Sequence, residues 1–330
     1  MTAMPDSPDL LLFCGGFFGY ASEIRHALEA RGRRVALFDD RPATDSLSKA
    51  TLRLAPSLVR AQTERYFDGI IARMRGKPIR DVLVVKAEGF SPDTVRRLRT
   101  AFPHARFTLY FWDSYGNMPA DSRAKAALFD RVLSFDPRDA GQDETLIYRP
   151  LFFVDRFAQL PGVVQDIDVL FFGTMHGDRF PVLQRIARAL PPSVRFEKFL
   201  YFPAKWLFAI HAARYPAMLR ADRGDFIYTP KSRAELLELL ARSRIVVDIE
   251  RPVQCGYTMR TLEALGSGRK LITTNAEVAN ADFYNPDNIL VIDRAAPQIA
   301  ASYLEAPYQP VAADILYRYS LSGWLDDVLP

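Results

Sequence analysis

The sequence has few of the residues on which metal, redox and membrane-spanning functions depend. Its 330 residues include two cysteines, Cys14 and Cys255, and four histidines, and none has the spacing of a metal site or a redox pair. So few cysteines indicate a reducing compartment. The longest run of apolar residues and glycine, residues 10–21, is shorter than the roughly 20 residues of a membrane span. Residues 1–9 lack the basic-then-apolar order of a signal peptide. We therefore expect a cytoplasmic protein that requires no metal or cofactor.

The composition, with 49% hydrophobic and 25% charged residues, is that of a soluble globular protein and excludes a disordered or fibrous one. The length is sufficient for two ordinary domains. A net charge of +4 and a pI near 9.0 favour anionic partners such as nucleotides, phospholipid headgroups or nucleic acid. Nucleic acid has the least support of these partners, because no recognition motif is present.

Short apolar runs alternate with helical patterns in the first half of the chain. Such alternation is typical of parallel strands joined by crossover helices. The patterns predict helices at residues 21–31 and 94–102. They predict strands at residues 10–14, 34–38, 82–85, 107–111 and 132–135.

The same alternation restarts in the second half, after a segment at 154–165 that contains Pro161-Gly162 and is interpreted as a linker. A helix is predicted at 180–190, and strands at 167–172, 195–199, 226–228, 245–249, 270–274 and 289–292. The sequence therefore predicts an α/β protein of two Rossmann-like domains, residues 1–155 and 166–300. A helical tail, residues 301–330, is expected to pack back on the first domain.

Ligands of open parallel sheets bind beyond the carboxyl ends of the strands, so the loops at those ends are the candidate sites. In the second domain the first such loop runs from Gly173 to Arg179. Its glycines let the backbone approach a phosphate, and the amides at the following helix start favour an anion. The candidate ligand residues are Gly173, Thr174, His176 and Arg179. A tight turn that merely requires glycine is the alternative interpretation.

The second candidate loop precedes a short helix whose buried face is predicted to carry Met259, Leu262 and Leu265. Gly256, Tyr257 and Thr258 lead into it, with Thr258 as a plausible N-cap. Arg260 and Glu263 are three residues apart and share a face. The arginine suits a diphosphate and the carboxylate suits the two hydroxyls of a ribose. A surface ion pair of little energetic value is the alternative.

These segments carry a family resemblance. Residues 256–268 and the following 270–275 resemble the donor-binding helix and next strand of glycosyltransferases of the two-Rossmann (GT-B) fold. Residues 168–179 resemble the start of their donor domain. The similarity is greatest to bacterial glycosyltransferase-like proteins of surface-polysaccharide and spore-coat type, over about 166–295. It implies two domains facing across a cleft, a nucleotide-sugar donor in the second domain, and a ribose bound by Glu263.

The resemblance also bears on the acceptor and on stereochemistry. The implied acceptor is a hydroxyl of a glycan or of a lipid-linked sugar in polysaccharide synthesis. Cys255 stands where retaining members often carry a glutamate, eight residues before Glu263, and this departure favours an inverting mechanism. Tyr228 and Lys231, after a short predicted strand, are expected to contact the base or the diphosphate.

An inverting transferase needs a base for the acceptor hydroxyl. Asp113 follows a predicted strand of the first domain and is the first candidate, with capping of the turn at 113–117 as its alternative role. Glu88, after another strand, and Glu23, on the first helix, are held in reserve. Lys86 could steady acceptor or phosphate charge, or could simply be solvated.

The first domain also has a glycine-containing loop between its first strand and helix. Gly15, Gly16, Phe17 and Phe18 of this loop, together with Trp112, are expected to face the acceptor. The loop lacks the G-x-G-x-x-G order, although Asp39 and Asp40 end the next strand near the distance seen in dinucleotide sites. An NAD(P)-dependent oxidoreductase is therefore one alternative. A catalytically silent relative that binds a glycan or nucleotide is another.

Residues 196–220 interleave aromatic and basic side chains. Such a pattern suits contact with a membrane surface that carries a lipid-linked acceptor. It equally suits an ordinary helix packed on a sheet. Peripheral contact at the inner face of the membrane is thus a further expectation.

Overall fold

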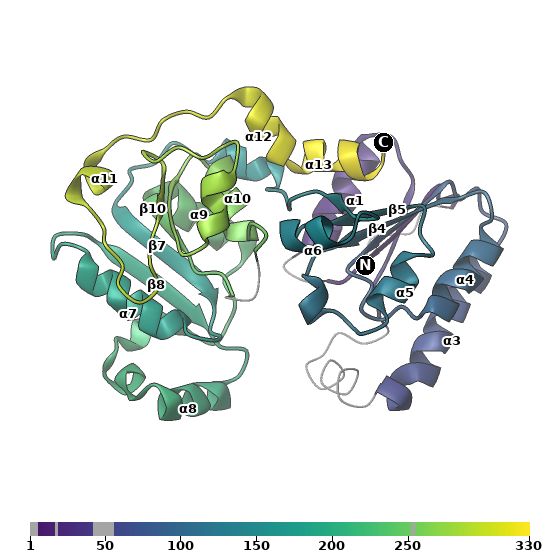
Figure 1. The fold of residues 1–330 in the computed structure, drawn as a ribbon, viewed down its shortest axis with the longest axis horizontal. Coiled ribbons are helices and arrows are strands. Elements are labelled where there is room, and N and C mark those ends of the chain that lie inside the picture. The colour runs from purple at the N-terminus through teal and green to yellow at the C-terminus, as the bar shows by residue number, and fades with distance from the viewer. Residues whose placement is uncertain (1–5, 17–18, 42–55, 252–254) are drawn as a thin grey trace. The chain divides into compact units, whose positions relative to one another are not determined.

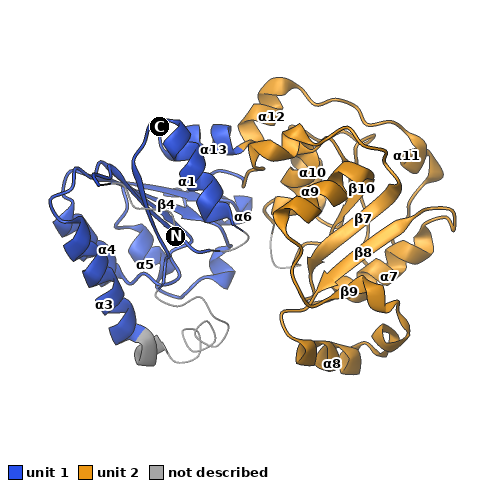
Figure 2. Cartoon of the chain, turned by 180° about the vertical axis from the view of Figure 1, so that it is seen from behind, with its two compact units in different colours: residues 1–150, 321–330 blue, residues 151–320 orange. Residues whose placement is uncertain are grey.

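The computed structural model describes residues 6–16, 19–41, 56–251 and 255–330, with the backbone alone at 56–59. The chain divides into two compact units (Figure 2). Unit 1 comprises Met1–Pro150 and Leu321–Pro330, and unit 2 comprises Leu151–Ser320. The chain passes between the units at 150–151 and at 320–321. The segment 154–165, interpreted as a linker from its Pro-Gly pair, instead belongs to unit 2, where it contains a 3₁₀ helix, η2 (Asp155–Gln159).

Over its described residues, unit 1 contains a six-stranded sheet in the order β2-β1-β3-β4-β5-β6, with every neighbouring pair parallel (Figure 1). The strands are β1 (Leu10–Cys14), β2 (Val35–Phe38), β3 (Asp81–Val85), β4 (Arg106–Phe111), β5 (Arg131–Ser134) and β6 (Ile147–Tyr148). The helices are α1 (Tyr20–Ala30), α3 (Pro56–Met74), α4 (Pro92–Ala101), α5 (Ser122–Ala126), α6 (Pro137–Gln142) and α13 (Leu321–Val328), with a 3₁₀ turn η1 (Tyr115–Asn117).

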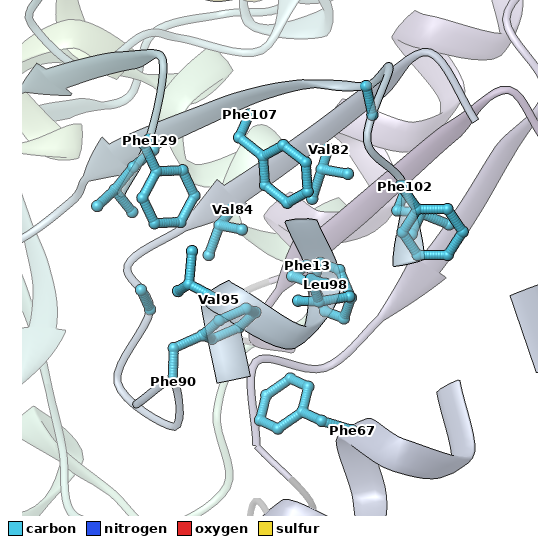
Figure 3. Packing of buried hydrophobic residues seen from close by; sticks show 14 of the residues in the cluster. Phe13, Phe67, Val82, Val84, Phe90, Val95, Leu98, Phe102, Phe107 and Phe129 are labelled. Atoms are coloured by element: carbon cyan, nitrogen blue, oxygen red, sulfur yellow. The ribbon is translucent and has the colours of Figure 1, made fainter. Parts of the chain in front are cut away.

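The central strands of unit 1 are largely apolar because helices cover both faces of the sheet. On one face, Phe13 of β1 packs edge-on to Phe90 at 5.2 Å, and Phe67 of α3 lies 4.5 Å from Phe90 (Figure 3). On the other face, Trp324 of α13 is fully buried and meets the ring of Tyr110 at 4.9 Å. The last helix of the chain is thus a core element of unit 1.

Over its described residues, unit 2 contains a second parallel sheet of six strands, in the order β12-β11-β10-β7-β8-β9. The strands are β7 (Ile167–Thr174), β8 (Phe196–Tyr201), β9 (Phe226–Ile227), β10 (Ser243–Asp248), β11 (Lys270–Thr273) and β12 (Ile289–Val291). The helices are α7 (Arg179–Ala189), α8 (Lys205–Arg214), α9 (Arg233–Arg242), α10 (Met259–Gly266), α11 (Ala301–Glu305) and α12 (Ala313–Tyr319), with 3₁₀ turns η3 (Pro216–Arg220), η4 (Arg223–Asp225) and η5 (Ala276–Asn280).

The predicted fold class, two successive Rossmann-like α/β units, is confirmed. Each predicted strand is present with its ends shifted by no more than a residue or two, and β6 is an addition. In unit 2 the chain runs from β7 outward through β8 and β9, then returns to start β10 on the other side of β7. The carboxyl ends of β7 and β10 therefore form a topological switch point, where ligands of such sheets bind. The expected tail, 301–330, is divided: α11 and α12 belong to unit 2, and α13 belongs to unit 1.

Gly266, the last residue of α10, gives a test of packing in unit 2. An added Cβ there would overlap the ring of Phe153, whose own amide is fixed by a 2.9 Å bond to the carbonyl of Tyr319. We expect Gly266→Ala to lower the free energy of unfolding by about 1–3 kcal/mol, measured by chemical denaturation. Adding Phe153→Leu should recover part of the loss.

The control for this prediction is Gly69→Ala, within α3, because nothing lies within 4 Å of its added Cβ. It should leave stability unchanged or raise it by roughly 0.5–1 kcal/mol. Equal stability of Gly266→Ala and wild type would mean that α10 can shift away from Phe153 at no cost.

Candidate functional site

A partly buried arginine joins the two loops at the switch point of unit 2. Arg179, the first residue of α7, donates from Nε to the carbonyl of Ile249 at 2.9 Å and from a terminal nitrogen to the carbonyl of Thr174 at 2.8 Å. Burial lowers the pKa of Arg179 to about 10, so that it stays charged at neutral pH. A Cβ at Gly173 would lie 3.1 Å from this guanidinium. The glycine therefore makes room for Arg179, which is a different role from the predicted approach to a phosphate.

The start of α10 is tied to the end of β10. Thr258 caps the helix, because its hydroxyl accepts from the amide of Thr261 at 3.2 Å. The hydroxyls of Thr258 and Thr261 both donate to one carboxylate oxygen of Asp248, at 2.9 and 3.0 Å. Asp248 is fully buried, and burial raises its pKa. The helix start leaves the amides of Met259 and Arg260 without an intrahelical acceptor, in the position where helices bind anions.

Arg260 and Glu263 form an ion pair at this helix start, with 2.5 Å between guanidinium nitrogen and carboxylate oxygen. The guanidinium lies over the ring of Phe172, 3.2 Å from its centroid, at the end of β7. The two side chains are only 17% and 8% exposed. The alternative of an exposed surface pair is therefore wrong, and both groups are held in fixed orientations.

A third arginine links the remaining loops of this edge. Arg294, after β12, donates to both carboxylate oxygens of Asp178 at 2.9 and 3.1 Å and to Glu250 at 3.0 Å. Glu250 also accepts from the hydroxyl of Thr274, after β11, and burial raises its pKa. The loops that follow β7, β10, β11 and β12 are thus connected by charged side chains.

His176 lies half-buried among these cations. Burial, followed by the charges of Arg179, Arg251 and Arg294, lowers the pKa of His176 to about 3. The imidazole is therefore neutral at physiological pH. A neutral ring can still donate one N–H to a ligand oxygen.

Several predicted donor residues have other surroundings. Tyr257 is buried against Phe283, with 5.3 Å between ring centroids, and the carbonyl of Gly256 accepts from the side-chain amide of Asn275 at 3.2 Å. Tyr228 and Lys231 follow the edge strand β9, two strands from β7, and Lys231 lies over a β8 ring, that of Phe199, at 4.3 Å. Tyr228 and Lys231 thus lie away from the other predicted donor residues, after the edge strand β9. The residues that the structure brings together near the carboxyl ends of β7 and β10 are Thr174, His176, Arg179, Thr258, Arg260 and Glu263.

Sequence reasoning found Glu263 but missed two further carboxylates of this site, Asp248 and Glu250, and the arginine Arg294. Asp248 and Glu250 end β10 or follow it closely, and Arg294 follows β12 by three residues. The rule that selected the other candidates, polar residues at carboxyl ends of buried strands, would have found them too.

A second charged cluster lies at the carboxyl ends of the unit 1 strands. The ammonium of Lys86, after β3, contacts Asp113 at 2.7 Å and Glu88 at 3.0 Å. Burial lowers the pKa of Lys86, but the two carboxylates outweigh that effect and the pKa lies above its ordinary value. Arg41, after β2, pairs with Glu88 on its other side. Two of the three candidate bases, Asp113 and Glu88, are thus joined through one lysine.

The backbone beneath this cluster is strained. Lys86 and Ala87 have φ angles of 80° and 58°, in the left-handed region that residues with a Cβ rarely adopt. The fully buried Lys125 donates to the carbonyls of Ala87 at 2.8 Å and Phe90 at 3.0 Å. Such strain persists where the surroundings hold it and is most frequent at functional sites.

The remaining unit 1 candidates are distributed more widely. Glu23 lies in the first turn of α1. Gly16, which follows Gly15 in the loop after β1, donates its amide to the carboxylate of Asp39 at 3.1 Å. Trp112, expected to face the acceptor, is 9% exposed and packs between the rings of Tyr20 and Tyr110. Phe17 and Phe18 lie outside the described residues.

The described residues contain no group of three or more histidine, cysteine, aspartate or glutamate side chains placed to hold a metal ion. Within the same residues, every helix is too short or too polar to cross a membrane.

Comparisons with known proteins establish the fold. No protein-family model and no curated protein matches the sequence. The structure is similar to a glycosyltransferase from Rickettsia africae, with TM-score 0.61 and 11% identity over 98% of this chain and 97% of that one. It is similar to Anabaena Alr3699/HepE in complex with UDP and glucose, with TM-score 0.61 and 11% identity over 98% and 99% of the two chains. It is also similar to a UDP-GlcNAc 2-epimerase from Neisseria meningitidis bound to UDP-GlcNAc, with TM-score 0.55 and 10% identity over 97% and 98%.

Identities this low define the fold alone, and that fold is of the GT-B glycosyltransferase type. Two parallel six-stranded sheets with interleaved helices, as described above for each unit, agree with this assignment.

Asp40 supplies a pH test of the unit 1 cluster. Burial raises the pKa of Asp40 from 3.8 to about 6, against the opposing charge of Arg41. Below pH 3.8 the carboxyl is protonated in both folded and unfolded chains, so it has no effect. Between about pH 4 and 6 the unfolded chain releases this proton while the folded protein retains it, so the stability falls as the pH rises, and the loss is complete above about pH 6. We expect Asp40→Asn to raise the free energy of unfolding at pH 8 by up to about 3 kcal/mol, and by little near pH 4.

Denaturation curves of Asp40→Asn and wild type across this pH range measure the difference. Asparagine keeps an acceptor for the amide of Glu88, which bonds Asp40 at 3.2 Å. The exposed Asp93→Asn on α4 should show no comparable pH dependence. A stability difference that stays constant with pH would mean that Asp40 is not the titrating group.

Proposed function

We propose that this protein is a glycosyltransferase that moves a sugar from a nucleotide-activated donor to a hydroxyl of a glycan or lipid-linked acceptor. The proposed setting is bacterial surface polysaccharide synthesis, in the cytoplasm or at the inner face of the membrane. The observation that carries the proposal is the meeting of Arg179, Arg260 and Glu263 with the start of α10 at the unit 2 switch point. Support also comes from similar folds whose structures contain UDP with glucose, UDP-glucose or UDP-GlcNAc.

In this proposal the diphosphate lies at the start of α10. The amides of Met259 and Arg260 and the Arg260 guanidinium donate to it, and Glu263 accepts from the ribose hydroxyls. The ion pair with Arg260 holds the Glu263 carboxylate in one orientation. The ordering cost of both side chains is therefore met before the ligand arrives.

The charges at this edge are nearly balanced. Four arginines (Arg179, Arg251, Arg260 and Arg294) lie near four carboxylates (Asp178, Asp248, Glu250 and Glu263). Affinity for a diphosphate would then come from oriented donors more than from a general positive potential. We therefore infer a binding constant that depends only modestly on salt.

For the reaction we propose direct displacement with inversion. The acceptor oxygen attacks the anomeric carbon, the bond from that carbon to the phosphate oxygen breaks, and the nucleoside diphosphate leaves with the electron pair. Asp113 takes the proton of the acceptor hydroxyl. Lys86 orients Asp113 and offsets its charge together with that of Glu88. The diphosphate is stabilised by amides and arginine, and the proposal requires no metal or cofactor.

A different sugar-nucleotide reaction is the second candidate, because a UDP-GlcNAc 2-epimerase is among the similar structures. Mass spectrometry distinguishes the transferase from the epimerase. The protein is incubated with a panel of nucleotide sugars, with and without a lipid and glycan extract. Transfer attaches the sugar to an acceptor, whereas epimerisation leaves an isomer of the donor. An oxidoreductase is disfavoured, because the loop after β1 lacks the G-x-G-x-x-G order of dinucleotide sites. A catalytically silent relative would bind the nucleotide and yield no product.

Substitution at the helix start tests donor binding. We expect Glu263→Gln and Arg260→Met each to weaken the affinity for the preferred nucleoside diphosphate, because each removes a charged hydrogen-bond partner. Bonds of this type are worth about 1.5–3 kcal/mol, or roughly 10- to 150-fold in affinity. Isothermal calorimetry measures the change.

The matched control is Arg242→Met, because Arg242 pairs with Asp166 just before β7, at the opposite end of the same sheet. It should bind nucleotide as wild type does. Unchanged affinity in both Glu263→Gln and Arg260→Met would remove the α10 start from the site.

Asp113→Asn tests the proposed base. Asparagine keeps the shape and cannot accept the proton, so we expect turnover to fall by about 10²–10⁴-fold while nucleotide affinity persists. Asp93→Asn, on the exposed face of α4, should leave turnover unchanged. Near-normal turnover of Asp113→Asn with the true acceptor would assign Asp113 a structural role and direct the test to Glu88 and then Glu23.

A further inference from the structure

We propose that unit 2 docks on an anionic phospholipid membrane through one surface, residues 203–224, here called the α8 surface. It consists of α8, η3 and the segments beside them. In Figures 1 and 2 α8 lies at one end of unit 2, with no other element of that unit beyond it.

The two faces of α8 differ in their surroundings. Phe208 packs inward against Phe202 at 5.7 Å and Phe226 at 5.0 Å, which attaches the helix to unit 2. Trp206 and Ile210, four residues apart on one face, are 64% and 57% exposed. An attached helix that keeps a large apolar pair in water indicates a surface with a partner.

The neighbouring η3, which packs on α8, adds a third exposed apolar side chain. Leu219 is 71% exposed, whereas the preceding Met218 is buried. Single exposed apolar residues are ordinary on protein surfaces. Here three exposed apolar side chains lie within 14 residues, on the neighbouring elements α8 and η3. They form a group and are not scattered single residues.

The charge of the α8 surface indicates which class of partner binds there. Its residues include four basic side chains and one acidic one, hence a net charge of +3: Lys205, Arg214, Arg220, Arg223 and Asp222. Lipid phosphates complement this charge within a Debye length. Tryptophan and aliphatic side chains beside basic residues are the composition of interfacial helices, whose apolar face enters the boundary between headgroups and acyl chains. A nucleic acid would match the charge and would leave Ile210 and Leu219 without apolar contact.

Tryptophan fluorescence gives a direct readout of this contact. The chain has three tryptophans, and the other two, Trp112 and Trp324, are buried in unit 1. Quenching by brominated lipid therefore reports on Trp206. The measurement needs no sugar nucleotide, so its failure and the failure of the proposed transferase activity are distinguishable.

The test uses the full chain with vesicles of phosphatidylglycerol and phosphatidylcholine, compared with phosphatidylcholine alone. We expect flotation with the anionic vesicles, a blue shift and quenching of Trp206, and release at high salt. Trp206→Ser with Ile210→Ser should lower vesicle affinity at least about tenfold. Lys205→Glu with Arg214→Glu should lower it by about fivefold or more for each residue.

Matched controls lie elsewhere on the chain. Val164→Ser removes an 83% exposed apolar residue of unit 2, and Arg73→Glu reverses an exposed charge on α3 of unit 1. Both should bind vesicles as wild type does, and circular dichroism should show all variants folded.

Three outcomes would overturn the proposal. One is the absence of binding to anionic vesicles, and another is binding that survives the Trp206 and Ile210 substitutions or proceeds without quenching of Trp206. The third is a lipid-free dimer, seen by sedimentation velocity, that the same substitutions abolish, because the partner would then be a second copy of the chain.

Discussion

The partly buried guanidinium of Arg179 is the constraint on which the carboxyl edge of unit 2 depends. A charge withdrawn from water needs hydrogen-bond partners, and here the carbonyls of Thr174 and Ile249 accept bonds from it. The loops after β7 and β10 must therefore keep these carbonyls in place. The absence of a side chain at Gly173 follows from the position of Arg179, whose charge also adds to the effect of burial in lowering the pKa of His176.

In both units a cation at the carboxyl ends of the strands lies between two carboxylates. In unit 1, Lys86 lies between two carboxylates, and in unit 2, Arg294 lies between two others. The carboxylates hold each cation in position without a ligand. They also cancel much of its charge, so that no strong positive potential remains at these strand ends. Selection among anions would then depend on the directions of the donors more than on electrostatic steering.

The strands could be predicted from the sequence because a parallel sheet covered on both faces requires nearly continuous apolar runs. The pairing of Arg260 with Glu263 could also be predicted, since it depends only on helical spacing. The bonds from Arg179 to the carbonyl of Ile249 and from Arg294 to Glu250 could not, because they join loops brought together by the order of the strands.

Other features were ambiguous in the sequence. A Pro-Gly pair occurs in an irregular segment within a unit as readily as at a boundary between units, and 154–165 lies within unit 2. Tyr257 precedes a predicted helix, and Trp112 follows a predicted strand. At such positions an aromatic ring can serve packing or ligand binding equally well. Only the neighbours of each ring, such as Phe283 beside Tyr257, decide between the two roles.

The placement of α13 has a consequence for synthesis of the chain. Trp324 closes one face of the unit 1 sheet over Tyr110, yet the ribosome reaches it only after all of unit 2 has been made. Domains generally fold as they emerge, from the N-terminus onward. Unit 1 must instead wait with its β4 face uncovered while 170 residues of unit 2 are translated. During that interval the nascent chain exposes apolar surface, which makes it a natural client for a chaperone at the ribosome.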